Sequence, residues 1–241
     1  MKPFHKKFIF AAIAISCLCI AGCWIGDFYY SRSFINAYQF YDGIKVRRAT
    51  LNSTKWIDIW GTTTKEVGLL SKGSDKDLFD DLCDLYGDNT YNREVAIPGD
   101  GYPTANHPPC AGIDVISNKD FDAEHPAGTS LADIMTIQYR SAVKFIENGY
   151  KNQKDYWEDI RKPLDELQPT DLTLSIRNIF LIFDKEPDVL ETHGLTFFWT
   201  TTEGITYTTS FNYDFTLPEG EVEPYTVSIE YDTIYNYTPK H

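Results

Sequence analysis

The sequence lacks the motifs that mark the common enzyme classes. It has no H-E-x-x-H pair of zinc ligands, no G-x-S-x-G nucleophile turn and no glycine-rich loop that would cradle phosphates. The histidines beyond residue 22 are His107, His125, His193 and His241, and their spacing is not that of metal ligands. Two of them precede a proline, which favours packing in turns over ligation. We therefore predict no metal, no cofactor and no catalytic residue.

Basic residues are also scarce. The chain has 22 Lys and Arg against 35 Asp and Glu, which gives a formal net charge of −13. Such a chain repels nucleic acid and anionic lipid, because phosphate recognition needs a positive patch, and we expect no nucleic-acid partner. The many carboxylates leave one enzymatic alternative, a glycoside hydrolase, whose two acidic residues need not be close in sequence.

Long apolar runs are missing except at the start of the chain. The basic residues Lys2, Lys6 and Lys7 are followed by an uncharged apolar run over residues 8–22, a pattern typical of a secretory signal peptide. As a helix this run would rise only about 22 Å, less than the roughly 30 Å hydrocarbon core of a bilayer. A membrane-spanning helix is therefore the weaker interpretation.

The end of this run resembles the bacterial lipobox, with the residues Ile20-Ala21-Gly22-Cys23. The resemblance implies cleavage before Cys23 and lipid on this cysteine, and several acyl chains anchor a protein durably in a membrane. Trp24 stands where an inner-membrane retention signal has Asp, so we expect the outer membrane. Surface lipoproteins of Bacteroides-type bacteria usually carry an acidic run after the cysteine, which is missing here. The choice between the periplasmic and the external face stays open.

Few cysteines remain after such cleavage. Of the five in the chain, Cys17 and Cys19 leave with the signal peptide and Cys23 carries lipid. Cys83 and Cys110 are then an even pair in an oxidising compartment, so we predict a disulfide between them. On the chain-entropy model this bond would stabilise the fold by roughly 3.5 kcal/mol. Two free, buried thiols are the alternative.

The rest of the sequence predicts a mostly β protein. We expect residues 1–22 to be the signal peptide, 23–44 a tether or a first strand, and 45–241 an antiparallel β-sandwich, immunoglobulin-like or similar, with one or two short helices. Helical spacing from residue 74 to 86 ends at Gly87. Residues 195–199 and 205–211 flank a turn that contains Gly204, which indicates a hairpin. Further strands are expected at 55–60, 112–116, 172–183 and 225–231, while residues 130–148 fit helix or strand.

Tryptophans are the candidates for a binding role. Trp56 and Trp60 are four residues apart, so in a strand they share one face. On the surface of the protein they could stack on sugar rings. The simpler interpretation, which we favour at this point, is that both fill the core of the sandwich.

Two phrases of the sequence carry a family resemblance. Asp-Ala-Glu-His-Pro-Ala-Gly at 122–128 and Phe-Asp-Lys-Glu-Pro at 183–187, together with the lipobox and the acidic, Tyr-rich body, resemble a family of Bacteroides-type lipoproteins without an assigned activity. The resemblance implies a location in the cell envelope and a fold, but it supplies no catalytic residues. We expect a lipid-anchored, non-enzymatic module that binds or scaffolds a component of the cell envelope, either a glycan or an envelope protein. The alternative is a glycan-binding lipoprotein of a polysaccharide-uptake system.

Overall fold

The computed structural model describes residues 28–51, 54–96, 103–151, 158–216 and 235–236. Most elements in this part of the chain are strands, and two are α-helices, so the predicted mostly β class is confirmed. Cys23 and the strand expected at 225–231 lie outside the described residues. No helix among the described residues is both long and apolar enough to cross a membrane.

The strands follow one another along the chain with few helical interruptions. In order they are β1 (Phe28–Ser31), β2 (Ala37–Leu51), β3 (Thr54–Gly68), β4 (Arg93–Ala96), β5 (Thr104–His107), β6 (Cys110–Ser117), β7 (Met135–Ser141), β8 (Glu158–Pro163), β9 (Ser175–Phe183), β10 (Thr192–Thr201), β11 (Thr206–Asp214) and β12 (Tyr235–Asn236). The α-helices are α2 (Ser74–Leu85) and α3 (Val143–Glu147).

Several of these elements confirm the predictions. The strand expected at 55–60 is part of β3, the helix expected at 74–86 is α2, and the predicted hairpin is β10–β11 with Gly204 at a φ of 81°. The ambiguous segment 130–148 contains both β7 and α3. Of the segment 23–44, for which we expected a tether or a first strand, the part from residue 28 onward forms β1 and the start of β2. Apolar side chains such as Phe34 and Ile35 bury it against the domain.

The longest elements, β2 and β3, form one antiparallel hairpin that bends. Its register shifts beside Tyr41 and Ile44, where Gly61 lies against the Tyr41 side chain. A Cβ at Gly61 would lie 2.7 Å from Cγ of Tyr41, so only glycine fits between the strands at this point.

The bend gives the two halves of the hairpin different neighbours. The start of β2 pairs in parallel with β5, whereas residues 57–59 of β3 pair with β9. The larger sheet therefore curls, with six strands in the order β3-β2-β5-β9-β7-β8 and an additional β3–β9 pairing. The smaller sheet has the order β12-β11-β10-β6. The parallel pair departs from a purely antiparallel sandwich, so the immunoglobulin-like assignment stays a prediction.

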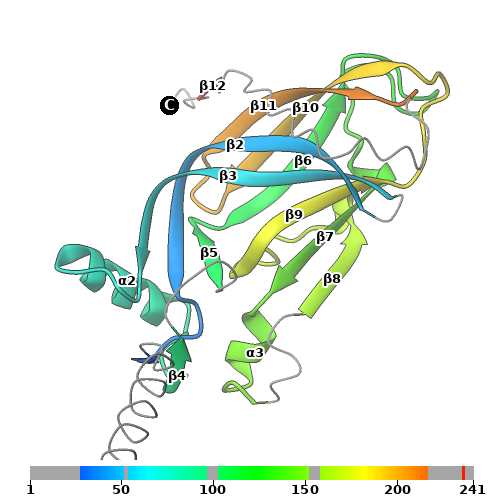
Figure 1. Ribbon diagram of the computed structural model, residues 1–241. Helices are drawn as coiled ribbons and strands as arrows, with labels where there is room; N and C mark the ends of the chain where they lie inside the picture. The colour runs from blue at the N-terminus through cyan, green and yellow to red at the C-terminus, as the bar shows by residue number, and fades with distance from the viewer. Residues whose placement is uncertain (1–27, 52–53, 97–102, 152–157, 217–234, 237–241) are drawn as a thin grey trace, which may run out of the picture.

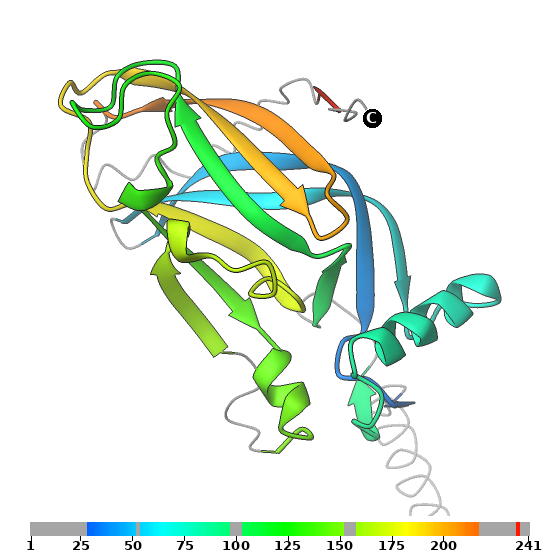
Figure 2. The same ribbon diagram turned by 180° about the vertical axis from the view of Figure 1, so that it is seen from behind.

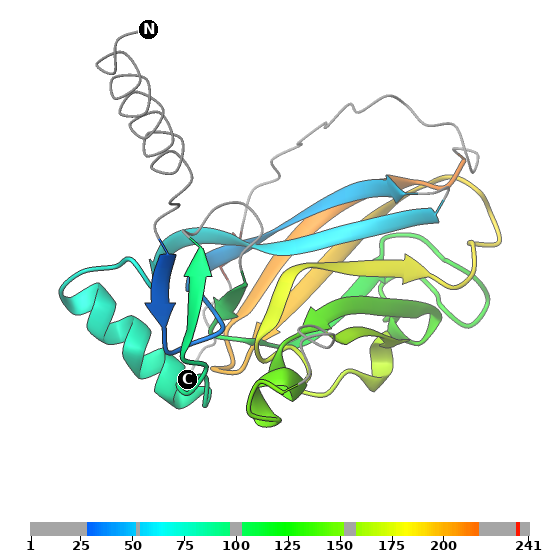
Figure 3. The same ribbon diagram turned by 60° about the horizontal axis from the view of Figure 1, so that its bottom comes forward.

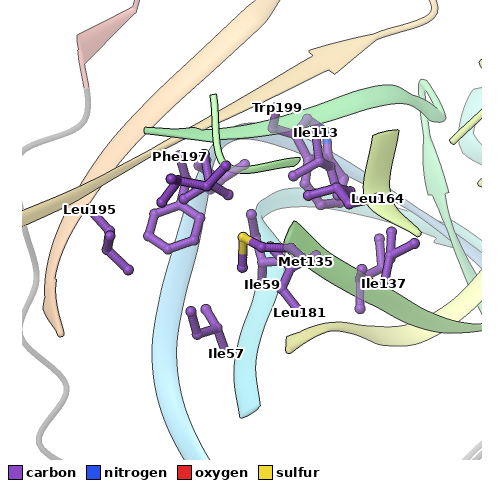
Figure 4. Packing of buried hydrophobic residues seen from close by; sticks show 14 of the residues in the cluster. Ile57, Ile59, Ile113, Met135, Ile137, Leu164, Leu181, Leu195, Phe197 and Trp199 are labelled. Atoms are coloured by element: carbon purple, nitrogen blue, oxygen red, sulfur yellow. The ribbon is translucent and has the colours of Figure 1, made fainter. Parts of the chain in front are cut away.

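The two sheets share one hydrophobic core. In Figures 1 and 2 the ribbons of β6 and β10 cross those of β2 and β3. Between the sheets lie apolar side chains from both (Figure 4): Ile57, Ile59, Met135, Ile137 and Leu181 from the larger sheet, and Ile113, Leu195, Phe197 and Trp199 from the smaller one. The burial of Trp199 is complete, and its indole N–H donates to the Tyr41 hydroxyl at 3.1 Å.

A second core lies at one end of the molecule, beside α2 and α3. We call this end the base; it comprises β1, β4 and the C-terminal end of α2 (Figures 1 and 3). Helix α2 buries Phe79, Leu82 and Cys83 there, against Tyr38 of β2 and Val67 of β3. Spacing of three and four residues places the buried side chains of α2 on one face, which explains why the sequence predicted this helix correctly.

Candidate functional site

The two candidate tryptophans lie on the outer face of the six-stranded sheet. Side chains alternate along β3, so Ile57 and Ile59 are buried in the core while Trp56 and Trp60 are half-buried on the opposite face. Their shared face follows from their spacing, as predicted. Neither belongs to the core cluster, so the interpretation that both fill the core is wrong.

Asp58 lies between the two tryptophans on this outer face. Its carboxylate is fully buried, although it points away from the core. Arg47 of β2 lies opposite in the strand register and donates to Asp58 Oδ2 from Nε at 2.8 Å and from Nη2 at 2.6 Å. On the other side Phe180 of β9 lies opposite Asp58 and packs edge-on against Trp56, with 4.9 Å between the ring centroids.

The guanidinium of Arg47 is therefore fixed by two contacts. The ion pair with Asp58 orients it, and it lies over the Trp60 ring with 5.2 Å from Cζ to the centroid. Its side chain is still 43% exposed. An oriented guanidinium beside a half-exposed indole offers planar N–H donors to carboxylate or sulfate oxygens and an apolar face to a flat partner.

These residues form part of a row that crosses five strands. The strand registers place Arg47 opposite Asp58, Asp58 opposite Phe180, Phe180 opposite Gln138 of β7, and Gln138 opposite Arg161 of β8. Directly opposed residues share a face of a sheet. Neighbouring strands are about 4.8 Å apart, so the row measures about 19 Å. We call Arg47, Asp58, Phe180, Gln138 and Arg161, with Trp56 and Trp60, the aromatic row.

The charge of the aromatic row differs from that of the whole chain. It contains two arginines and one aspartate, whereas the chain as a whole carries a formal charge of −13. Arg161 is exposed, so both ends of the row present a guanidinium to solvent. The row can attract an anionic group although the protein as a whole repels anions.

The predicted disulfide is not present. Cys83 and Cys110 are both free and buried, and they belong to different cores, Cys83 beside α2 and Cys110 between the two sheets. A disulfide requires Cβ atoms within about 4.5 Å, which side chains buried in separate cores do not provide. Burial raises the pKa of Cys83 to about 12 and raises that of Cys110 as well, so neither thiol is reactive in the folded protein.

The histidines are placed as structural groups. The Nδ1 atom of His107 lies 2.7 Å from the Tyr86 hydroxyl, and burial lowers the pKa of this histidine. His193 is buried, with Nδ1 2.8 Å from the Ser117 hydroxyl. Within the described ranges, no group of three or more His, Cys, Asp or Glu side chains is placed to hold a metal ion.

The two phrases that carried the family resemblance meet in space. Lys185 of the second phrase forms an ion pair with Asp122 of the first at 2.6 Å. The ring of Phe121, which precedes the first phrase, stacks on the ring of Phe183, which begins the second, with 5.3 Å between the ring centroids. Comparison of the chain with protein-family models, curated proteins and solved structures finds no match. The resemblance to Bacteroides-type lipoproteins therefore stays a prediction.

Proposed function

We propose that this protein is a lipid-anchored, non-enzymatic module of the cell envelope that binds glycans with its aromatic row. Lipid on Cys23 and an outer-membrane location are part of the proposal and rest on the signal peptide and the lipobox-like residues. The observation that carries glycan binding is the position of Trp56 and Trp60. Both indoles are half-buried on the outer face of the sheet, opposite the core, and the oriented Arg47 lies over the Trp60 ring.

The chemistry of the row favours acidic glycans. An indole face packs on the C–H face of a sugar ring, and this contact is largely apolar. Arg47 and Arg161 suit the carboxylate of a uronic acid or a sulfate ester, since guanidinium groups pair with both through two parallel hydrogen bonds. Gln138 between them offers one acceptor and two donors for hydroxyl groups. Asp58 is fully covered, so its role is to position Arg47.

The test is a screen of the lipid-free mature chain against neutral, uronate-containing and sulfated oligosaccharides. We expect binding to the acidic classes, and Trp60→Ala should weaken it at least about tenfold, which is about 1.4 kcal/mol. Tyr30→Ala is the matched control, because this tyrosine is 69% exposed but lies on β1, away from the row. Thermal unfolding of each variant shows whether it is folded.

A second variant separates charge from stacking. Arg47→Gln should weaken binding to acidic glycans and make the remaining affinity less dependent on salt, because exposed charge interactions are screened. The proposal of glycan binding is wrong if no oligosaccharide binds, or if the folded Trp60→Ala protein binds as tightly as the Tyr30→Ala control. A scaffold that binds an envelope protein would then be the better description.

A further inference from the structure

We infer that the base of the protein faces the lipid surface and that the opposite end points away from it. The aromatic row lies between these two ends. This orientation rests on the proposed lipid at Cys23. The base consists of β1, β4 and the C-terminal end of α2, as defined above. The occupant proposed for this face is the headgroup surface of the membrane that holds the lipid.

The chain between the lipidated residue and the fold is short. Five residue steps separate Cys23 from Phe28, the first residue of β1. A fully extended chain spans at most about 3.6 Å per residue, so β1 begins no more than about 18 Å from the lipidated residue. A domain on such a short connection cannot turn its far end toward the membrane.

Strand β1 is fixed to the rest of the base. It pairs along its length with β4, and Arg32, the next residue, forms an ion pair with Asp84 of α2. Asp88, buried after α2, accepts the backbone N–H groups of Phe34 and Ile35 at 2.7 Å each. The anchor therefore positions α2, β4 and the start of β2 together with β1.

The end opposite the base is formed by the β9–β10 connection. Strand β9 begins at residues that pair with β5, next to the base, and ends at Phe183, so the β9–β10 connection lies at the far end (Figures 1 and 3). The exposed side chains Val189 and Leu190 lie in that connection. Along β3, Trp60 and Trp56 are eight and twelve residues from Gly68 at the base, which is at most about 26 Å and 40 Å. The aromatic row therefore lies along β3 between the base and the far end.

The surface of the base fits a zwitterionic membrane. Tyr30 is 69% exposed and Leu85 is 67% exposed, and a tyrosine places its ring and hydroxyl well at a membrane–water boundary. The nearby helix α2 also exposes the carboxylates of Asp77 and Asp81, which anionic headgroups repel. We expect the base to approach zwitterionic lipid more closely than anionic lipid.

The experiment measures energy transfer from a dye on the protein to an acceptor dye on the lipids. The full chain, processed and lipidated in cells, is reconstituted into phosphatidylcholine vesicles as Leu85→Cys or as Val189→Cys. The two positions are matched, because these side chains are 67% and 62% exposed. Cys83 and Cys110 are buried and do not compete for the dye. Transfer should be several-fold greater from position 85 than from position 189, and Tyr30→Cys should behave like Leu85→Cys.

Two controls distinguish failure of the proposed orientation from failure of the proposed lipid anchoring. Twelve Gly and Ser residues inserted after Trp24 should bring the two transfer values together, because such a linker adds about 20 Å of reach. Equal transfer from positions 85 and 189 without the insertion, or greater transfer from position 189, would each overturn the inference. A difference that survives the insertion would support it, because contacts of the base with lipid would then hold the orientation without the short connection. Mass spectrometry of the N-terminal peptide reports the lipid separately. An unmodified Cys23 would overturn both this inference and the proposed anchoring, whereas lipidation with equal transfer overturns the orientation alone.

Discussion

At the scale of single residues, the contact that ties the two sheets together is centred on Tyr41. Its hydroxyl accepts the N–H of Trp199 at 3.1 Å and donates to the carbonyl of Pro108 at 2.5 Å. Tyr41 lies in β2 and Trp199 in β10, so one hydroxyl joins the larger sheet, the smaller sheet and the β5–β6 connection. Burial raises the pKa of this hydroxyl, which stays protonated and able to donate.

Tyr41→Phe should therefore destabilise the protein by about 1–3 kcal/mol. The change leaves the buried indole N–H of Trp199 and the partly buried carbonyl of Pro108 without their partner, and an unsatisfied buried group carries the cost of its lost solvation. Urea unfolding measures the free energy of unfolding. Tyr30→Phe is the control, since an exposed tyrosine should change this energy by no more than about 0.5 kcal/mol. A loss for Tyr41→Phe as small as that of the control would contradict the role given to the hydroxyl.

The candidate site was readable from the sequence only in part. The spacing of Trp56 and Trp60 placed them on one face, but it could not say which face, because aromatic residues suit either side of a sheet. The alternation with Ile57 and Ile59 was the available signal, since two β-branched aliphatic residues compete for the core side. Arg47 and Phe180 were not predictable, because strand register depends on partners distant in sequence.

At the scale of elements, the loop after β6 is attached to the β9–β10 connection by a charged cluster around His125. This histidine is 5% exposed, with Nδ1 2.7 Å from Asp122 and Nε2 3.1 Å from Asp133. Lys185 binds the other oxygen of Asp122. Burial alone would lower the pKa of His125, but its hydrogen bonds to the two carboxylates outweigh this effect, and the pKa is raised. Both ring nitrogens then carry protons that they donate to carboxylates.

This cluster predicts a pH dependence of stability with a defined sign. A histidine whose pKa is raised by folding stabilises the protein fully below its ordinary pKa of about 6.5, and the contribution is lost as the pH rises through the raised value. The difference in melting temperature between the natural protein and His125→Gln should therefore be larger at pH 6 than well above neutral pH. Calorimetry over a pH series measures it.

The Asp133→Asn variant is the companion to this test. Removing one carboxylate should lower the pKa of His125, so the loss of stability should begin at a lower pH than in the natural protein. If the natural protein and His125→Gln differed in melting temperature by the same amount at every pH, the assignment of a protonated His125 would be contradicted.

Local elements were predicted better than their connections. Helix α2 and the β10–β11 hairpin depend on neighbouring residues, namely spacing and a glycine in the turn. The segment expected to be a tether or a first strand shows the limit of local patterns. Residues 28–44 have no clear period, and β1 is fixed by pairing with β4, about 65 residues later in the chain. The parallel β2–β5 pair joins segments equally far apart and has no local signal.

At the scale of the whole molecule, the two cores explain why the number of cysteines led to a wrong prediction of a disulfide. An even number of cysteines in an exported chain favours a disulfide only if the fold brings the pair together. Here α2 carries Cys83 into the core beside the base, while β6 begins with Cys110 in the core between the sheets. Both thiols are small apolar side chains in these settings, and the stability of the domain comes from packing.

The separation of the two thiols predicts how many thiols per chain react with a thiol reagent. In the processed, lipidated chain no thiol should react with a thiol reagent under native conditions, because both are buried and their pKa values are raised. In guanidinium chloride without reductant, two thiols should react per chain. A disulfide would instead give none until a reductant is added, and an unmodified Cys23 would raise the count to three. The melting temperature should be the same with and without reductant, because no bond between the two cores is available to be broken.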